Sequence, residues 1–196
     1  MGNTSDIASR SGPAGDRADG IAAAARKAGI RGPAPVHLWN PPYCGEMDME
    51  IRADGTWFHE GSPIGRPGMV RMFANILKYE DGRHYLVTPV EKIGIRVEDA
   101  PFIAVDVDIG PDIVFHTNIG DSARLDADHP LVMEGTPDLP RPYVEVRGGL
   151  RARIDRKSFY RLAEQASKGP DGLMGVRSAG VYFPLELPSW HGSPPI

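Results

Sequence analysis

The sequence is poor in cysteine, with Cys44 as the single thiol in 196 residues. One cysteine excludes an internal disulfide framework and is typical of proteins in a reducing cytoplasm. We therefore expect a cytoplasmic protein. The residues beside Cys44 are Tyr43 and Gly45, which supply no cation to activate a nucleophile, so we interpret this cysteine as structural.

Long apolar runs and an excess of positive charge are also missing. No stretch approaches the roughly 20 apolar residues that a membrane-spanning helix needs. The formal net charge of -4 gives no general attraction to nucleic acid or to anionic membranes. We expect neither a membrane nor a nucleic acid as partner, and the sequence indicates no particular protein partner.

Catalytic and metal-binding signatures are absent from the sequence as well. Its six histidines are scattered, without His-x-x-x-His spacing, and the single cysteine excludes a Cys-x-x-Cys pair. No serine lies in a nucleophile elbow. We predict no metal, no cofactor and no catalytic residue set, which favours a binding protein over an enzyme.

The distribution of apolar residues divides the chain into four segments. Residues 1–15 are rich in Ser, Gly, Asn and Asp and predict a disordered tail. An N-terminal α+β domain is expected over residues 16–97, beginning with a helix at residues 17–28. Residues 98–101 form a connector to a domain of antiparallel strands and one helix over residues 98–187. A loose tail is expected over residues 188–196.

The first half shows alternating and helical patterns in succession. Strand 47–52 leads into an Asp54-Gly55 hairpin turn, after which Trp57 and His59 share one face of the return strand. Pro67 suits the first position of a helix. A second Asp-Gly turn at residues 81–82 precedes further strands. The apolar stripe expected on the helix comprises Met69, Met72, Phe73, Ile76 and Leu77.

The last third repeats the first in outline. Strands 143–147 and 150–154 flank a Gly-Gly turn and precede a helix capped by Asp155. Before it, alternation over residues 103–109 predicts a strand with Ile103, Val105, Val107 and Ile109 on one face. Residues 50–52 match residues 145–147 in type. We predict two small α+β domains built from a duplicated antiparallel strand–hairpin–helix–strand unit, with residues 61–68 as a loop expanded in the first copy.

Residues 61–68 lead the candidate binding elements, because a helix starting at Pro67 would present free N–H groups beside Arg66. Such a site suits a phosphate or carboxylate, although a Gly/Pro segment can equally serve only to turn the chain. Polar groups also gather around the strand interrupted by Pro89. The predicted ligand-binding residues are Trp57 and His59 for stacking, Arg66 and Lys92 for an anion, and Thr88 and Glu91 for hydrogen bonds.

Two other functions are left open by the sequence. Asp106 and Asp108, or His129, could serve a metal-assisted or acid–base hydrolase, while outward carboxylates on a strand are the simpler explanation. A protein-interaction module is the other open function, through an exposed strand edge or through the face that Arg151 and Arg153 share, which could bind an anion. The alternative is that this basic stretch pairs with the acidic middle third of the chain.

Three segments of the chain resemble a bacterial family catalogued as domain-of-unknown-function family 1285. They are residues 51–66 (IRADGTWFHEGSPIGR), residues 85–92 (YLVTPVEK) and residues 97–102 (VEDAPF). The resemblance implies a duplicated α+β core whose C-terminal half is superficially similar to pleckstrin-homology folds. It also implies a ligand pocket at the domain interface for a nucleotide-like molecule, and a role in signal transduction.

Overall fold

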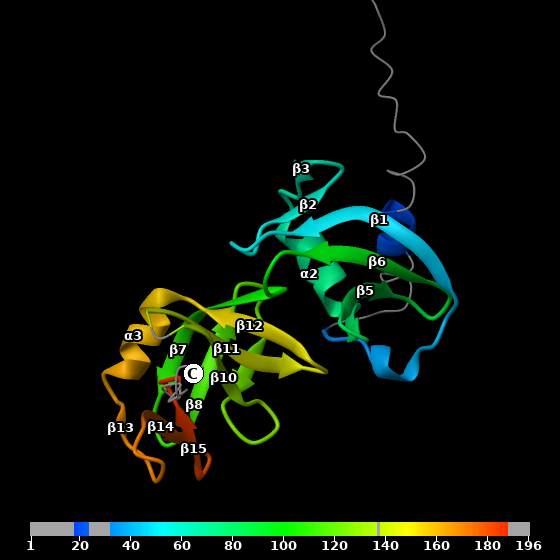
Figure 1. The fold of residues 1–196 in the computed structure, drawn as a ribbon. Helices are drawn as coiled ribbons and strands as arrows, with labels where there is room; N and C mark the ends of the chain where they lie inside the picture. Colours follow the sequence, from blue (N-terminus) through cyan, green and yellow to red (C-terminus); the bar gives the residue numbers. More distant parts are fainter. Residues whose placement is uncertain (1–17, 24–31, 137, 188–196) are drawn as a thin grey trace, which may run out of the picture.

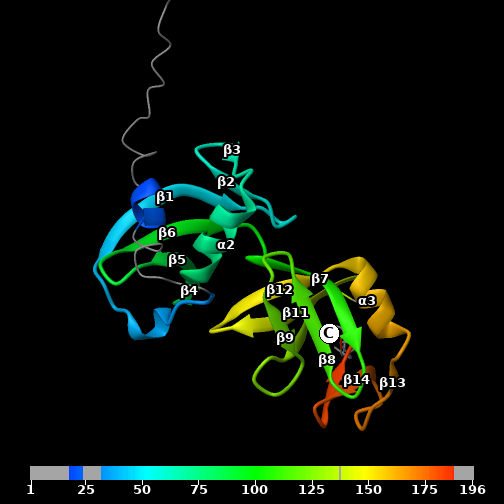
Figure 2. The ribbon, with the colours of Figure 1, turned by 180° about the vertical axis from the view of Figure 1, so that it is seen from behind.

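The computed structural model describes residues 18–23, 32–136 and 138–187, which form two domains (Figures 1 and 2). The N-terminal domain holds a six-stranded sheet with the strand order β3-β2-β1-β6-β5-β4. Its elements are η1 (Val36–Leu38), β1 (Tyr43–Ile51), β2 (Trp57–His59), β3 (Ser62–Pro63), α2 (Pro67–Asn75), β4 (Leu77–Glu80), β5 (Arg83–Val87) and β6 (Lys92–Val97).

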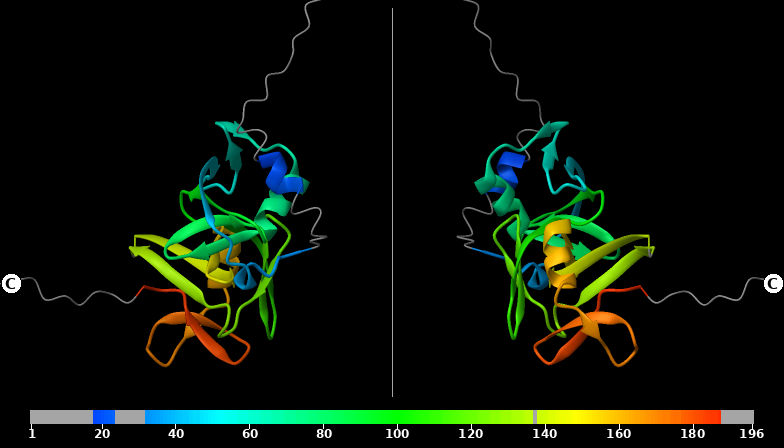
Figure 3. Two further views of the ribbon diagram at one scale, coloured as in Figure 1. Left: turned by 90° about the vertical axis from the view of Figure 1, so that its right-hand side faces the viewer. Right: turned by 90° about the vertical axis from the view of Figure 1, so that its left-hand side faces the viewer.

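The C-terminal domain holds a second six-stranded sheet and a small three-stranded one. The strand orders are β10-β11-β12-β7-β8-β9 and β13-β14-β15. Helix α3 packs on β7, and the three-stranded sheet lies at the end of the domain farthest from the N-terminal domain (Figures 1 and 3). The elements are β7 (Phe102–Ile109), β8 (Ile113–Thr117), β9 (Ser122–Arg124), β10 (Leu131–Thr136), β11 (Leu139–Arg147), β12 (Leu150–Ile154), α3 (Arg156–Ala163), β13 (Ser167–Lys168), β14 (Met174–Ser178) and β15 (Val181–Pro184).

The two large sheets confirm a duplicated α+β architecture. Each sheet joins two three-stranded meanders through one parallel pair, β1 with β6 in the first and β7 with β12 in the second. The strand orders coincide when β1 is matched with β7 and β6 with β12. The parallel pair is a feature that the predicted antiparallel unit lacked.

The phase of the predicted repeat is wrong. Helix α2 lies between the two meanders of its sheet, whereas α3 follows both meanders. Residues 50 and 51 therefore end the first strand of one sheet, with residue 52 just beyond it, while residues 145–147 end the fifth strand of the other. These segments are not equivalent, so the comparison that made residues 61–68 an expanded loop has no structural basis.

Helix α2 is shorter than its apolar stripe predicted. Phe73 and Ile76 are buried as expected, but the helix ends at Asn75 and Leu77 begins β4, opposite Leu86 of β5. Two adjacent apolar residues such as Ile76 and Leu77 are compatible with either a helix or a strand. Leu77 is in a strand because it pairs with β5. The Asp81-Gly82 turn closes this β4–β5 hairpin with positive φ at both residues, as predicted.

Strand β7 departs from the predicted alternation at a bulge. Ala104 pairs with Thr117 and Asp106 pairs with His116, so the register shifts between the two pairs. The extra residue turns Val105 outward, where it is 41% exposed, while Val107 is fully buried. In α3, Asp155 caps the helix by accepting a hydrogen bond from the Ser158 N–H at 2.7 Å, as predicted.

Residues 18–23 are helical and bury Ala18, Ile21 and Ala22 in the core. The rest of the helix expected at residues 17–28, and the tails expected at residues 1–15 and 188–196, lie outside the described residues. Within the described part of the chain, no helix is long and apolar enough to cross a membrane.

Candidate functional site

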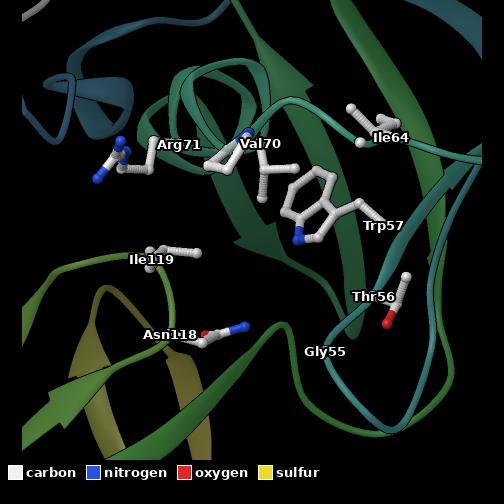
Figure 4. Close-up of a pocket in the computed structure, with 10 residues that line it drawn as sticks. Gly55, Thr56, Trp57, Ile64, Val70, Arg71, Asn118 and Ile119 are labelled. Carbon is white, nitrogen blue, oxygen red and sulfur yellow. The ribbon is translucent and has the colours of Figure 1, made fainter.

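A cavity of about 240 Å³ opens between the two domains beside the N-terminus of α2 (Figure 4). Its walls come from the β1–β2 turn, the segment that leads into α2, and the β8–β9 turn of the other domain. None of the lining residues that the structure describes is acidic. They are Gly55, Thr56, Trp57, Ile64, Gly65, Pro67, Val70, Arg71, Asn118 and Ile119.

Trp57 supplies a buried polar group to the wall of this cavity. Its side chain is 1% exposed and its ring lies nearly parallel to that of Phe73, with centroids 6.3 Å apart. The indole Nε1 is buried and has no hydrogen-bond partner among the described residues. In Figure 4 this nitrogen points toward Asn118. A buried N–H without a partner is destabilising by about 1–3 kcal/mol, so an acceptor at this position would stabilise the site.

Asn118 faces Trp57 from the C-terminal domain. Its Oδ1 accepts a hydrogen bond from the Ile103 N–H at 3.0 Å, which identifies the other end of the amide as the NH₂ donor. Figure 4 shows that end directed into the cavity. The two domains therefore each contribute one neutral donor to the same space.

Helix α2 adds its N-terminus and one cation. Pro67 occupies the first helical position and has no N–H, and the N–H groups of Met69 and Val70 both donate to the Arg66 carbonyl. The helix therefore contributes the positive end of its dipole to the cavity wall rather than free N–H donors of these residues. Arg71 lies one turn further, at the cavity mouth. Its guanidinium points away from Trp57 in Figure 4, but the side chain is exposed and forms no ion pair with any described residue, so it can turn inward.

The structure brings only part of the predicted ligand site to this cavity. Trp57 lines it, whereas its ring face is covered by Phe73, so the indole offers an edge rather than a free stacking surface. Arg66 is the exposed N-cap of α2 and does not line the cavity. His59 is on the same strand face as Trp57 but outside the lining, and its Nε2 is buried with no partner among the described residues.

The remaining predicted residues lie in and beside the β5–β6 turn. Buried Thr88 accepts hydrogen bonds at its Oγ1 from the N–H groups of Val90 and Glu91. Lys92 pairs with Glu80 at 2.7 Å and lies 5.0 Å from the Tyr85 ring centroid. The Lys78 and Lys92 ammonium groups lower the pKa of Glu80 to about 2. These contacts order the turn, and they do not place Thr88, Glu91 or Lys92 beside Trp57.

Arg147 fastens the two domains next to the cavity. From β11 it pairs with Asp121 of the β8–β9 turn and donates to the Ala74 carbonyl, near the end of α2, at 2.7 Å. Its guanidinium also lies 5.0 Å from the Phe102 ring centroid. Burial lowers the pKa of Arg147 to about 10. The same turn thus carries Asn118 into the cavity and is fixed through Asp121 to the helix that forms the opposite wall.

His84 lines a second cavity between the domains, of about 220 Å³. The groups around it include Tyr79, whose ring centroid is 4.9 Å away, Asp99, and Arg151 of the other domain. Burial, with a smaller contribution from the Arg151 charge, lowers the pKa of His84 from 6.5 to about 4. The imidazole is therefore neutral at the interface near neutral pH.

This shift predicts acid sensitivity. The unfolded chain binds a proton at His84 near pH 6.5, and the folded chain only near pH 4, so stability falls as the pH drops through that window. The expected loss is on the order of 1–2 kcal/mol, reduced for partial solvation. Urea unfolding across the window measures it. His84→Gln should flatten the slope, whereas His37→Gln, at an exposed position, should not; equal slopes in both variants would contradict the assignment.

The candidate hydrolase residues occupy the open face of the second sheet and a nearby loop. Asp106 pairs with Arg161, and His129 lies 3.1 Å from Asp126. Asp108 lies 2.8 Å from His116 Nε2, and the other ring nitrogen lies 2.9 Å from Ser122 Oγ. In the ranges that the structure describes, no group of three or more His, Cys, Asp or Glu side chains could hold a metal ion.

The basic stretch of the C-terminal domain pairs with acidic residues of the middle third. Besides Arg147 with Asp121, the structure pairs Arg151 with Glu134 and Arg153 with Asp99, the latter at 3.4 Å. This arrangement matches the charge compensation that the sequence left as an alternative to an anion-binding face.

Sequence reasoning missed Arg71, Asn118 and Ile119. Arg71 is four residues after Pro67, which is one helical turn. The expected helix start at Pro67 was therefore a signal that could have placed Arg71 near the binding element. For Asn118 and Ile119 the sequence held only a weak signal, a polar turn before Gly120 in the other domain.

Both halves of the chain match family models. The N-terminal domain of DUF1285, described as a domain of unknown function, matches residues 34–100, and the C-terminal domain of DUF1285 matches residues 101–185. No curated protein matches the chain.

Two crystal structures are similar to this one. A DUF1285 family protein from Silicibacter pomeroyi is 54% identical with a TM-score of 0.78, over 85% of this chain and 94% of that chain. A DUF1285 family protein from Shewanella baltica is 28% identical with a TM-score of 0.50, over 60% of this chain and 91% of that chain.

Proposed function

We propose that this chain, which belongs to the DUF1285 family, binds a small anionic molecule in the cavity between its two domains. The observation that carries the proposal is the Trp57 Nε1–H, buried in the cavity wall without a partner among the described residues. The Asn118 NH₂ is directed into the same space, the positive end of the α2 dipole lies beside it, and no carboxylate among the described lining residues opposes an anion.

Anion binding here would couple the domains. The ligand would contact α2 on one side and the β8–β9 turn on the other, so its binding energy would add to the contacts of Arg147. A ligand that binds only when both domains contact it would raise the population of that domain arrangement. The increase would be set by the difference in ligand affinity between the two arrangements. Such a coupling would suit a role in signal transduction, with the ligand-bound pair of domains as the signalling state.

The test is Trp57→Phe, which removes one N–H and keeps an aromatic ring against Phe73. We expect calorimetric or thermal-shift titration with a panel of carboxylates, phosphate esters and nucleotides to find a binder of the wild type. Its affinity should fall about 10–100-fold in the variant, since a hydrogen bond to a charged group contributes roughly 1.5–3 kcal/mol. Trp39→Phe is the matched control, because Trp39 lies outside the cavity lining. A folded wild type that binds nothing in the panel would refute the proposal.

A hydrolase is the second candidate, favoured by the Ser122, His116 and Asp108 row. Its side chains can pass a proton from the serine hydroxyl to the imidazole, as acyl transfer requires. The row lies on an open sheet face, with 75% of the Asp108 side chain exposed, where solvent weakens its hold on the imidazole. Hydrolysis of p-nitrophenyl esters that is lost in Ser122→Ala would support this candidate, and equal rates in both proteins would remove it.

A further inference from the structure

We infer that the interdomain cavity selects a singly charged carboxylate joined to a small apolar group. This inference rests on the proposed anion site and specifies its ligand class. It follows from three properties of the cavity, namely the charge of its lining, its volume and the nature of its walls.

The charge of the lining favours a monoanion. Arg71 is the single formally charged side chain among the ten described lining residues, and it is exposed. The other two donors, the buried Trp57 Nε1–H and the NH₂ of exposed Asn118, are neutral. A phosphate monoester carries roughly -1.5 to -2 charges at neutral pH. Transfer of that charge from water to two neutral donors and one exposed cation would leave it poorly compensated.

The volume favours a small molecule. At about 240 Å³ the cavity is below the roughly 300–1,000 Å³ of pockets that enclose drug-sized ligands. A whole nucleotide belongs to that larger class. The cavity suits a short organic acid, and a nucleotide-like ligand would have to leave most of its surface outside.

The walls favour an apolar group beside the carboxylate. Ile64 and Val70 line the N-terminal side, and Ile119 lines the other. Figure 4 shows these side chains around the indole, with Asn118 at the opposite end of the cavity from Ile64. A carboxylate between Trp57 and Asn118 would place a branched or short aliphatic chain against these three residues. Its two oxygens would accept one hydrogen bond each, from the Trp57 Nε1–H and from the Asn118 NH₂. The oxygen of a neutral ester or amide is a weaker acceptor than a carboxylate oxygen.

The experiment compares matched probes on the full-length protein by isothermal calorimetry. The probes are 3-methylbutanoate, its neutral amide, isopentyl phosphate, and adenosine monophosphate. We expect 3-methylbutanoate to bind in the micromolar to millimolar range, the amide at least about 10-fold more weakly, and the two phosphates more weakly than the carboxylate.

The variants separate the cavity from its surroundings. Asn118→Asp keeps the acceptor for the Ile103 N–H and replaces the donor with a negative oxygen, so carboxylate binding should be abolished while thermal unfolding stays near that of the wild type. Arg71→Gln should weaken binding several-fold, and Arg66→Gln, at an exposed position outside the lining, should not change it.

The outcomes distinguish this inference from the function on which it rests. Tighter binding of isopentyl phosphate or adenosine monophosphate than of 3-methylbutanoate, lost in Asn118→Asp, would overturn the carboxylate class and leave anion binding at the cavity intact. Equal affinity for 3-methylbutanoate and its amide would overturn the charge argument. If none of the four probes binds the folded protein, the carboxylate inference is rejected. Anion binding itself is then still decided by titrating the wild type and Trp57→Phe with the wider panel of carboxylates, phosphate esters and nucleotides.

Discussion

Replacement of Arg147 by methionine is expected to lower the free energy of unfolding by about 3–5 kcal/mol. The side chain is 21% exposed and its partner Asp121 is 18% exposed, so methionine would leave a nearly buried carboxylate without a counter-charge. The Ala74 carbonyl would lose the Arg147 donor at the same time. Guanidinium unfolding followed by circular dichroism measures the change.

Arg151→Met is the matched control for this prediction. Arg151 also has one carboxylate partner and one aromatic neighbour, with its guanidinium 4.8 Å from the Tyr143 ring centroid. However, it and Glu134 are each 37% exposed, so solvent can replace the pair and the expected loss is at most about 1 kcal/mol. Equal losses in the two variants would show that the bridge between the domains does not depend on burial of Arg147.

The Arg147 variant should also report on coupling between domains. Arg147 ties the β8–β9 turn to the end of α2, so its loss loosens the turn that carries Asn118 relative to the helix, although Asn118 keeps its hydrogen bonds to Ile103. If the cavity binds its ligand through both domains, Arg147→Met should weaken ligand affinity without touching the cavity lining. Unchanged affinity in this variant would show that ligand binding does not depend on the Arg147 contact between the domains. It would then contradict the coupling on which the proposed signalling role depends.

Substitution of Gly55 by alanine has the second large expected effect, a loss of about 2–5 kcal/mol in the free energy of unfolding. Gly55 has φ +82°, which disfavours any side chain, and an added Cβ would lie 2.8 Å from both Ile103 Cγ1 and Asn118 Nδ2. The domain contact would have to open to admit it. Because Asn118 would move, we also expect ligand binding at the cavity to be lost.

Gly82→Ala separates the two components of that effect. Gly82 follows Asp81 in the other Asp-Gly hairpin turn and has φ +77°, but no atom of the described residues lies within 4 Å of a Cβ added there. Gly82→Ala therefore introduces backbone strain without a steric clash. The expected loss in the free energy of unfolding is about 1–2 kcal/mol. Thermal and urea unfolding of both variants measures the difference. If Gly55→Ala proves no more destabilising than Gly82→Ala, the close approach of the β1–β2 turn to the second domain is not a tight contact in solution.

Elements governed by neighbouring residues were predictable. The Asp81-Gly82 turn needs positive φ, which Gly and Asp tolerate, and the Asp155 cap needs only a side chain within reach of the third following N–H. Burial of Met49, Ile51 and Trp57 follows from alternation along two strands joined by a short turn. In each case the interacting groups are close in sequence, so the pattern of residue types is enough.

Elements that depend on a distant partner were mispredicted. Leu77 was assigned to a helix because its spacing fits one, and only the ladder with Leu86 makes it a strand. The bulge in β7 exposes Val105 because Thr117 and His116 set the register from the neighbouring strand. The repeat was placed out of phase because residues 50–52 and 145–147 are similar in type, whereas equivalence depends on which strands pair.

By itself the sequence determined a duplicated α+β chain, its hairpin turns, the residues of its core, and Trp57 as a candidate for binding. Only the tertiary structure decided which polar groups share a site. It placed Thr88 and Glu91 in the β5–β6 turn and Lys92 beside Glu80 of β4, and it brought Asn118 to Trp57 from the other domain. The physical reason is that an unpaired N–H and a convergent set of donors are properties of packing between segments far apart in the chain, and no local pattern encodes that proximity.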